Sequence, residues 1–121
     1  TSRKQPSVVA QREAMRDPTG AQRAILRQAV RRCRPGGRVV YSTCTYAPEE
    51  NEAIIDAVLR DVGPEALRLR PARIDGVMGS PGLTTWQGQS FHPSLANALR
   101  VWPHQNDTGG FFIAVLEKAN A

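Results

Sequence analysis

The chain has 121 residues, the size of one domain, and its hydrophobic fraction of 40% with only 6% aromatic residues predicts an aliphatic core. No apolar run is long enough to cross a membrane and the first residues lack the apolar segment of a signal peptide, so we expect a cytoplasmic location. The two cysteines, Cys33 and Cys44, are not spaced as a CxxC pair, and no histidine spacing suggests zinc, so we expect reduced thiols and no metal site.

The positive charge is concentrated in the first third of the chain. Residues 1–38 hold ten Lys and Arg against two acids (+8), whereas the remainder holds six against nine acids (−3), which together give the net charge of +5. A basic segment of this kind attracts a phosphate backbone. A solvated helix face in an arginine-rich protein would give the same count, so charge alone leaves both interpretations open.

A helix is predicted to begin at Asp17 and Pro18, because Asp is a favoured N-cap and Pro fits the first helical position. Residues 1–16 before it are expected to form an arm, and residues 17–121 the domain. The buried face of the helix is predicted from its apolar spacing to contain Ile25, Leu26, Ala29, Val30 and Cys33. This pattern makes Cys33 a core thiol, and residues 35–37 (PGG) end the helix.

A short strand over residues 38–42 follows, and its continuous apolar run is typical of a strand buried on both faces. Pro48 then begins a second helix whose exposed first turn carries Glu49, Glu50 and Glu52, which complement the helix dipole. Cys44 therefore lies where a strand ends and a helix begins, where backbone N–H groups favour a thiolate. The helix is expected to bury Ile54, Ile55, Val58, Leu59 and Val62 and to stop at Gly63.

The second half of the chain predicts short strands around a long connection. Residues 66–69, 101–102 and 111–116 are strand-like, with FFIAVL at 111–116 apolar enough for a central strand. Residues 70–93 are irregular, and Trp86, Phe91 and His92 within them could either anchor this stretch to the core, which we favour, or face a nucleic-acid base. The overall pattern indicates an α/β fold.

Two motifs give the chain a resemblance to a known family. Tyr41–Thr45 (YSTCT) with Pro48–Glu52 (PEENE), and Arg100–His104 (RVWPH) with Thr108–Ala114 (TGGFFIA), resemble motifs of the RNA cytosine-5 methyltransferases, and the likeness runs from about Gln22 to Lys118. It implies the C-terminal half of a Rossmann-like class I methyltransferase sheet, with three mixed strands and flanking helices. Residues 38–42, 66–69 and 111–117 would be its fifth, sixth and seventh strands, lying in the order fifth, seventh, sixth, with the seventh antiparallel.

The resemblance assigns Cys44 as a nucleophile that adds to carbon 6 of the target cytosine, although a free cysteine at a strand end is often simply buried. Thr43 and Thr45 could hold the loop of Cys44 or merely bond neighbouring backbone. His104 and Asp107 would lie near the active site, where they could contact RNA or remain surface residues. Gly110 could let backbone approach a ligand or only form a turn.

Several parts of such an enzyme are missing from this sequence. No glycine-rich turn follows a strand, so the motifs that bind S-adenosylmethionine are expected outside this chain. The unpaired edge of the strand at 38–42 is expected to meet the missing N-terminal half or a second copy of the chain. RNA, either ribosomal or transfer RNA, is the expected partner, with no DNA and no membrane. A non-catalytic RNA-binding or scaffold module derived from the fold is the alternative.

Overall fold

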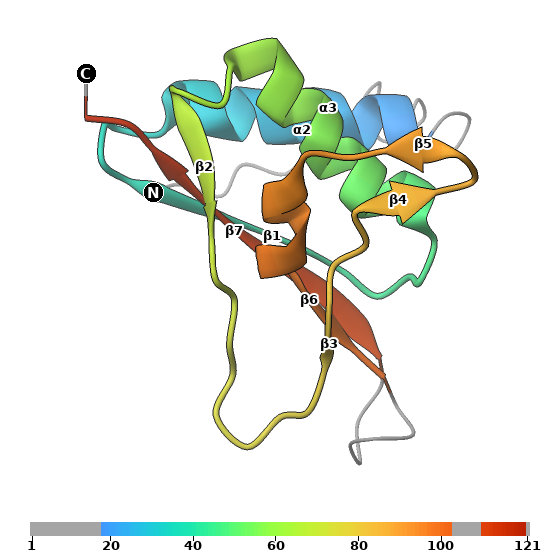
Figure 1. Ribbon diagram of the computed structural model, residues 1–121. Coiled ribbons are helices and arrows are strands. Elements are labelled where there is room, and N and C mark those ends of the chain that lie inside the picture. The colour runs from blue at the N-terminus through green and yellow to red at the C-terminus, as the bar shows by residue number, and fades with distance from the viewer. Residues whose placement is uncertain (1–17, 103–109, 121) are drawn as a thin grey trace.

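The computed structural model describes residues 18–102 and 110–120 (Figure 1). The predicted arm at residues 1–16 lies outside them, as do His104 and Asp107. The elements are α2 (Pro18–Arg32), β1 (Arg38–Thr43), the 3-10 helix η1 (Pro48–Glu50), α3 (Glu52–Val62), β2 (Leu67–Arg70), β3 (Ser80–Pro81), β4 (Thr85–Trp86), β5 (Gln89–Ser90), η2 (Pro93–Asn97), β6 (Leu99–Val101) and β7 (Phe111–Lys118). No helix in the described ranges has the length and apolar character needed to cross a membrane.

Strand β7 is the centre of the sheet. It pairs antiparallel with β1 along one edge, so that Val40 lies opposite Val115. The other edge is shared by β2, which pairs with residues 115–118, and β6, which pairs with residues 111–113. Strands β1 and β2 therefore run in the same direction on either side of an antiparallel β7. This is the order that the resemblance implies, and the α/β prediction is confirmed, although every pairing within the described ranges is antiparallel.

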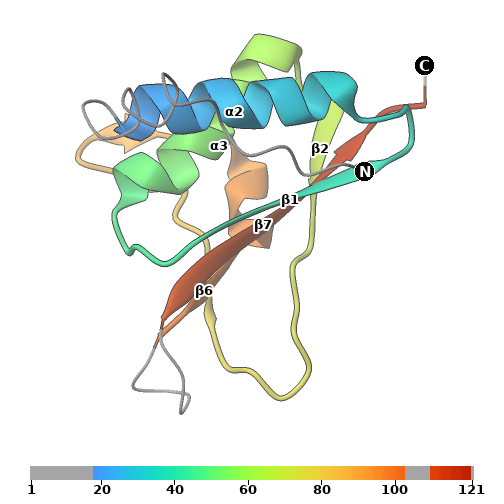
Figure 2. The same ribbon diagram turned by 180° about the vertical axis from the view of Figure 1, so that it is seen from behind.

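The core lies between this sheet and the two helices, which are on the same side of it in both views (Figures 1 and 2). Alternate residues of β7 point into the core, where Phe112, Ala114 and Leu116 are almost completely buried. Helix α3 supplies the predicted buried residues Ile54, Ile55, Val58 and Leu59, and Val62 packs against them half-buried. Gly63 ends this helix as predicted, with a φ of 101° that favours glycine.

The predicted buried face of α2 is only partly correct. Leu26 and Val30 are buried, whereas Ile25 is 47% exposed and Ala29 is exposed. Cys33 lies just beyond the end of the helix and is half-buried, so it is not a core thiol. Helix α2 contacts α3, η1 and β1 through the side that carries Leu26 and Val30, and an apolar stripe does not show how wide such a contact will be.

The prediction that the first strand is buried on both faces is wrong for this chain. Val39 and Tyr41 pack against the core, but Val40 points the other way and is 63% exposed. The helices cover one face of β1, and the described residues place no second layer over Val40. Strand β1 also pairs with β7 alone, so its outer edge has no partner strand in the part of the chain that the structure describes.

The long connection at residues 70–93 is anchored to the core, as we favoured. Phe91 is buried and Trp86 packs half-buried against the core. Three acids of η1 and α3 receive N–H donors from this connection: Glu49 from the Trp86 indole (3.0 Å), Glu52 from the Leu83 backbone (2.9 Å) and Asp56 from the His92 backbone (2.8 Å). These acids therefore hold the connection against the helix, in addition to any effect they have on the helix dipole.

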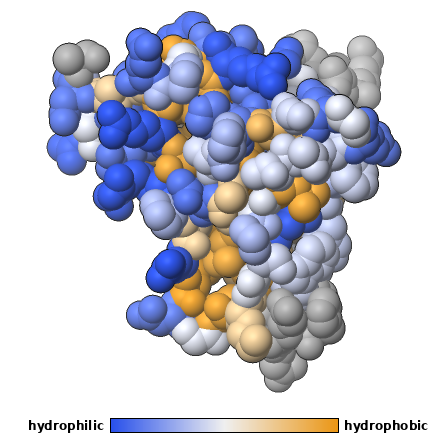
Figure 3. All heavy atoms as spheres, in the orientation of Figure 1, coloured by the Kyte–Doolittle hydropathy of each residue, from blue (hydrophilic) through white to orange (hydrophobic). Residues whose placement is uncertain are grey.

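The surface colours follow this arrangement (Figure 3). Hydrophilic residues predominate over the part that carries the helices, and hydrophobic residues form a band through the middle of the same face. The exposed Ile74 and Met78 belong to the segment between β2 and β3, which extends away from the helices (Figure 1). Single exposed hydrophobic residues of this kind are common and by themselves identify no site.

Candidate active site

Cys44 directly follows the last residue of β1, and its side chain is exposed. Residues 45–47 separate it from η1, which begins at Pro48 as predicted. This segment is one 3-10 turn, however, and α3 begins only at Glu52, so the thiol does not lie directly at the N-terminus of the α-helix. Both cysteines of the chain are free thiols. The accessible sulfur lies at the carboxyl end of the strand, in a connection that is neither helix nor strand.

A buried asparagine holds the two residues that flank Cys44. The Thr43 hydroxyl donates to Asn51 Oδ1 (2.5 Å), and Asn51 Nδ2 donates to the Thr45 carbonyl oxygen (2.9 Å). The Thr45 hydroxyl in turn accepts the Ala47 backbone N–H (3.1 Å). Asn51 is fully buried, so its two bonds to Thr43 and Thr45 are shielded from water on the side of the asparagine. The loop of Cys44 is therefore tied at the residue before the thiol and at the residue after it.

Asn51 occupies the N-cap position of α3 without capping it through its side chain. A side chain at this position commonly accepts a bond from the first turn of its helix. Here the amide is turned toward the Cys44 loop instead. The contact of Asn51 with Thr43 and Thr45 was not predicted from the sequence.

An ion pair lies beneath the same loop. Arg100 of β6 donates to Glu52 of α3 through Nε (to Oε2, 2.5 Å) and through Nη2 (to Oε1, 2.5 Å). Its remaining nitrogen, Nη1, donates to the Tyr46 carbonyl oxygen (3.1 Å). Glu52 is completely buried and Arg100 is 4% exposed, which corrects our prediction that Glu52 lies in an exposed helix turn. Burying a carboxylate at such a position costs much free energy unless the group is paired and hydrogen-bonded.

The ring of Tyr46 lies in a stack beside the loop. It is stacked on Trp102 with centroids 5.0 Å apart, and the Arg100 guanidinium lies 5.8 Å from the centre of the Trp102 ring. A Cβ atom built on Gly110 would come within 1.6 Å of the Tyr46 hydroxyl oxygen. The Tyr46 side chain thus fills the space that a Cβ on Gly110 would need. This packing explains why residue 110 is a glycine, and it could not be predicted from the sequence.

Substituting Gly110→Ala should displace the Tyr46 ring from Trp102, because the added methyl group and the phenol cannot share this space. We expect loss of the near-ultraviolet circular dichroism of the stacked pair and a cost of about 1–3 kcal/mol, as for overpacking. Gly76→Ala serves as a control for the spectrum alone, since nothing lies within 4 Å of a Cβ there but its φ of 78° makes an alanine strained. An unchanged spectrum in Gly110→Ala would contradict the close packing of Tyr46.

Tyr41 connects β1 to the start of η1. Its hydroxyl donates to the Glu50 carbonyl oxygen (2.6 Å). Burial, together with the nearby charge of Glu50, raises the pKa of Tyr41 to about 12. The phenol is therefore neutral at physiological pH and acts as a hydrogen-bond donor that holds the strand to the following turn.

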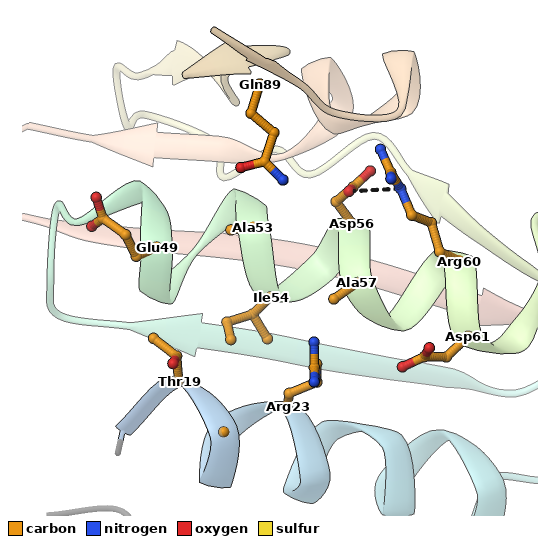
Figure 4. Close-up of a pocket in the computed structure, with 11 residues that line it drawn as sticks. Thr19, Arg23, Glu49, Ala53, Ile54, Asp56, Ala57, Arg60, Asp61 and Gln89 are labelled. Carbon is orange, nitrogen blue, oxygen red and sulfur yellow. Dashed lines mark ion pairs between the residues drawn. The ribbon is translucent and has the colours of Figure 1, made fainter. Parts of the chain in front are cut away.

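A surface hollow of about 540 Å³ lies elsewhere, between α2, α3 and β5 (Figure 4). Asp56 and Arg60 form an ion pair at its wall (2.9 Å), and Arg23 of α2 faces it from the other side. Neither Cys44 nor any residue of its loop lines this hollow. The residues that the sequence singled out therefore lie at the end of β1, away from this hollow.

The structure brings together some of the predicted site residues. Thr43, Cys44 and Thr45 share one loop, and Gly110 meets that loop through Tyr46, whereas His104 and Asp107 lie outside the described residues. The residues that sequence reasoning missed are Asn51, Glu52, Arg100 and Tyr46. A signal existed for Arg100, a charge between the apolar residues Leu99 and Val101, since such a charge requires a partner when buried.

Solved structures identify the class of protein to which this geometry belongs. The chain superimposes on the crystal structure of a methyltransferase homolog protein from Pyrococcus horikoshii with a TM-score of 0.73 and 36% sequence identity, covering 83% of this chain and 30% of that one. The fold is therefore that of part of a methyltransferase.

The family follows from the sequence comparisons. Residues 1–117 match the model of the 16S rRNA methyltransferase RsmB/F family, and the chain belongs to that family. It is 40% identical over 83 residues to a mouse 28S rRNA (cytosine-C(5))-methyltransferase, covering 69% of this chain and 10% of the relative. It is 34% identical over 134 residues to a Drosophila melanogaster tRNA (cytosine(34)-C(5))-methyltransferase, covering 82% and 18%. The chain thus spans less than a fifth of either relative.

Proposed function

We propose that this chain is part of an S-adenosylmethionine-dependent RNA cytosine-5 methyltransferase and supplies its nucleophile, Cys44. The observation that carries the proposal is an exposed thiol on a loop whose neighbouring residues are fixed by buried partners, in a chain of the RsmB/F family. A free cysteine with only a packing role is usually buried.

The proposed role of Cys44 is covalent catalysis. Its thiolate forms a bond to carbon 6 of cytosine, and the electron pair displaced from the double bond makes carbon 5 nucleophilic. After carbon 5 has been methylated and has lost its proton to a base, the carbon–sulfur bond breaks and the thiolate is released. S-adenosylmethionine would supply the methyl group when it is bound.

The described residues do not fit a site for that cofactor. Gly36 and Gly37 precede β1 and form a turn, in which the Gly36 N–H donates to the Lys118 carbonyl oxygen (2.9 Å), so they are not a phosphate- or cofactor-binding loop after a strand. We therefore assign the cofactor to another part of the protein. That part, the missing N-terminal half, is the proposed partner for the open edge of β1, with a second copy of this chain as the alternative.

The remaining assignments are part of the same proposal. Thr43 and Thr45 position the nucleophile, and Gly110, His104 and Asp107 lie at or near the RNA. Residues 1–16 form the arm and residues 17–121 the catalytic-domain segment, in a cytoplasmic protein. Exposed arginines of α2 and the turn after it suit a phosphate backbone, namely Arg23, Arg31, Arg32 and Arg34. Ribosomal or transfer RNA is the proposed substrate.

A trapping assay tests the function. RNA containing 5-fluorocytosine blocks loss of the proton from carbon 5, so a working site should leave a covalent protein–RNA band on a denaturing gel. We expect this band when the chain is combined with the cofactor-binding part and S-adenosylmethionine, and not with the chain alone. Cys44→Ala should abolish it, and Cys33→Ala should not.

Either of two results would contradict the proposal. A band that persists in Cys44→Ala would assign the nucleophile to another residue. RNA binding without any adduct in the complete protein would favour the alternative, a non-catalytic RNA-binding or scaffold module that retains the methyltransferase half-fold.

A further inference from the structure

We infer that Glu52 and Arg100 are positioning residues for the nucleophile: this buried pair fixes the backbone of the Cys44 loop so that the thiol meets carbon 6 of the cytosine. The inference rests on the proposed function of Cys44. Both residues would affect the reaction without contacting the substrate.

The first argument is the geometry of the three hydrogen bonds that the forked guanidinium of Arg100 donates. Arg100 uses two nitrogens on Glu52 and a third on the Tyr46 carbonyl oxygen, two residues after the nucleophile. The planar guanidinium sets the directions of all three bonds together. Glu52 is itself held by the Leu83 backbone N–H, so the carboxylate cannot turn away without losing another bond. The position of the Tyr46 carbonyl thus follows from the position of α3.

The second argument is that Arg100 also restrains the side chain of Tyr46. Its guanidinium lies over the Trp102 ring, and that ring stacks on Tyr46. The same guanidinium lies 5.9 Å from the centre of the Phe112 ring in the core. One residue therefore holds both the backbone and the ring of Tyr46 against parts of the fold that do not move easily.

The third argument is that the other end of the loop is fixed independently. Asn51 binds Thr43 and Thr45 on either side of Cys44, while the Glu52–Arg100 pair binds Tyr46. Asn51 and Glu52 are neighbours at the start of α3, so a single turn of helix controls the whole loop. Such restraint matters because misplacing a reacting atom by about 1 Å can cost on the order of 10²-fold in rate.

The chain offers a matched control for the test. Asp56 is another carboxylate of α3, 3% exposed, that pairs with an arginine (Arg60) and accepts a backbone N–H from the same connection (His92). It makes none of these contacts with the Cys44 loop. Glu52→Gln and Asp56→Asn therefore each remove a buried carboxylate charge from α3, although the partner of Asp56, Arg60, is 65% exposed and Arg100 is not. Only the first substitution affects Tyr46 through Arg100.

The experiment measures two reactions of Cys44 in the complete methyltransferase. One is adduct formation with 5-fluorocytosine RNA, which requires a correctly placed thiol. The other is alkylation by iodoacetamide, followed by mass spectrometry of the Cys44 peptide, which requires only an accessible thiol. We expect Glu52→Gln to slow adduct formation by about 10- to 100-fold with RNA affinity unchanged, whereas alkylation stays near the parent rate. Asp56→Asn should change neither reaction.

A second variant keeps the test decisive if Glu52→Gln folds poorly. Arg100→Lys retains the charge opposite Glu52 but lacks the fork, and it should show the same separation of the two rates. Equal adduct rates in the Glu52, Arg100 and Asp56 variants, when Cys44→Ala abolishes the adduct, would overturn the inference and leave the proposed function intact. An adduct that survives in Cys44→Ala would instead overturn the proposed function.

Discussion

Arg100→Met is expected to lower the free energy of unfolding by about 3–5 kcal/mol, the usual cost of leaving one partner of a buried ion pair without the other. Glu52 has no exposed surface, so after the substitution its carboxylate would be buried with only the Leu83 N–H as a partner. Met is unbranched and fills much of the space of the arginine stem, so the loss reports chiefly the missing charge and hydrogen bonds. Urea denaturation followed by circular dichroism measures it.

Two further variants separate the cost of burying an unpaired charge from the cost of losing an ion pair. The double substitution Glu52→Gln with Arg100→Met should recover much of the lost stability, because no charge is then buried. Arg27→Met breaks the ion pair between α2 and α3, whose side chains are 37% and 43% exposed, and should cost no more than about 1 kcal/mol. A cost for Arg100→Met as small as that for Arg27→Met would show that water reaches Glu52.

Local patterns were sufficient to predict most of the elements. The apolar spacing of α3, the glycine that ends it and the apolar FFIAVL strand all describe interactions within a few residues of each other, and the structure confirms them. The order of the strands came from the resemblance to the methyltransferases and not from the residue pattern. The pattern alone does not determine which edges of β7 receive β1 and β2, because pairing of distant strands leaves no periodic signal.

The errors on β1 and α2 have one physical cause. An apolar residue shows that a surface can be covered, but not whether this chain covers it. Val40 and Ile25 are as apolar as their buried neighbours, yet the described residues leave both exposed. Periodicity therefore overestimates burial wherever the described residues do not cover an apolar face.

Residues of the candidate site could be predicted only where they belong to a short sequence motif. Cys44 was recognised by its neighbours in sequence, YSTC and PEENE. The pair beneath it joins residues 48 positions apart, at the start of a helix and in a short strand, and no local rule connects them. From the sequence, Glu52 was interpreted as an acid that complements the helix dipole, because that interaction alone can account for an acid in the first turn of a helix. Tertiary pairing overrides that explanation in the structure.

Val40→Lys should separate the stability of this chain from its association with the proposed cofactor-binding part. Since Val40 is 63% exposed, the substitution should change the free energy of unfolding by no more than about 0.5 kcal/mol. If the cofactor-binding part covers this face of β1, the lysine becomes a buried charge without a partner. We then expect association to weaken by on the order of 10²-fold, equivalent to about 3 kcal/mol, in titration calorimetry of the two parts.

Ile25→Lys is the matched control, because Ile25 is also an exposed aliphatic residue but belongs to α2, on the opposite side of the sheet from Val40. It should leave the association unchanged. If the two variants bind equally well, the free face of β1 is not where the cofactor-binding part docks. If Val40→Lys instead converts a dimer of this chain into monomers in sedimentation experiments, a second copy covers the face. The exposed side chain of Val40 thus tests which partner covers the free face of β1, the strand that precedes Cys44.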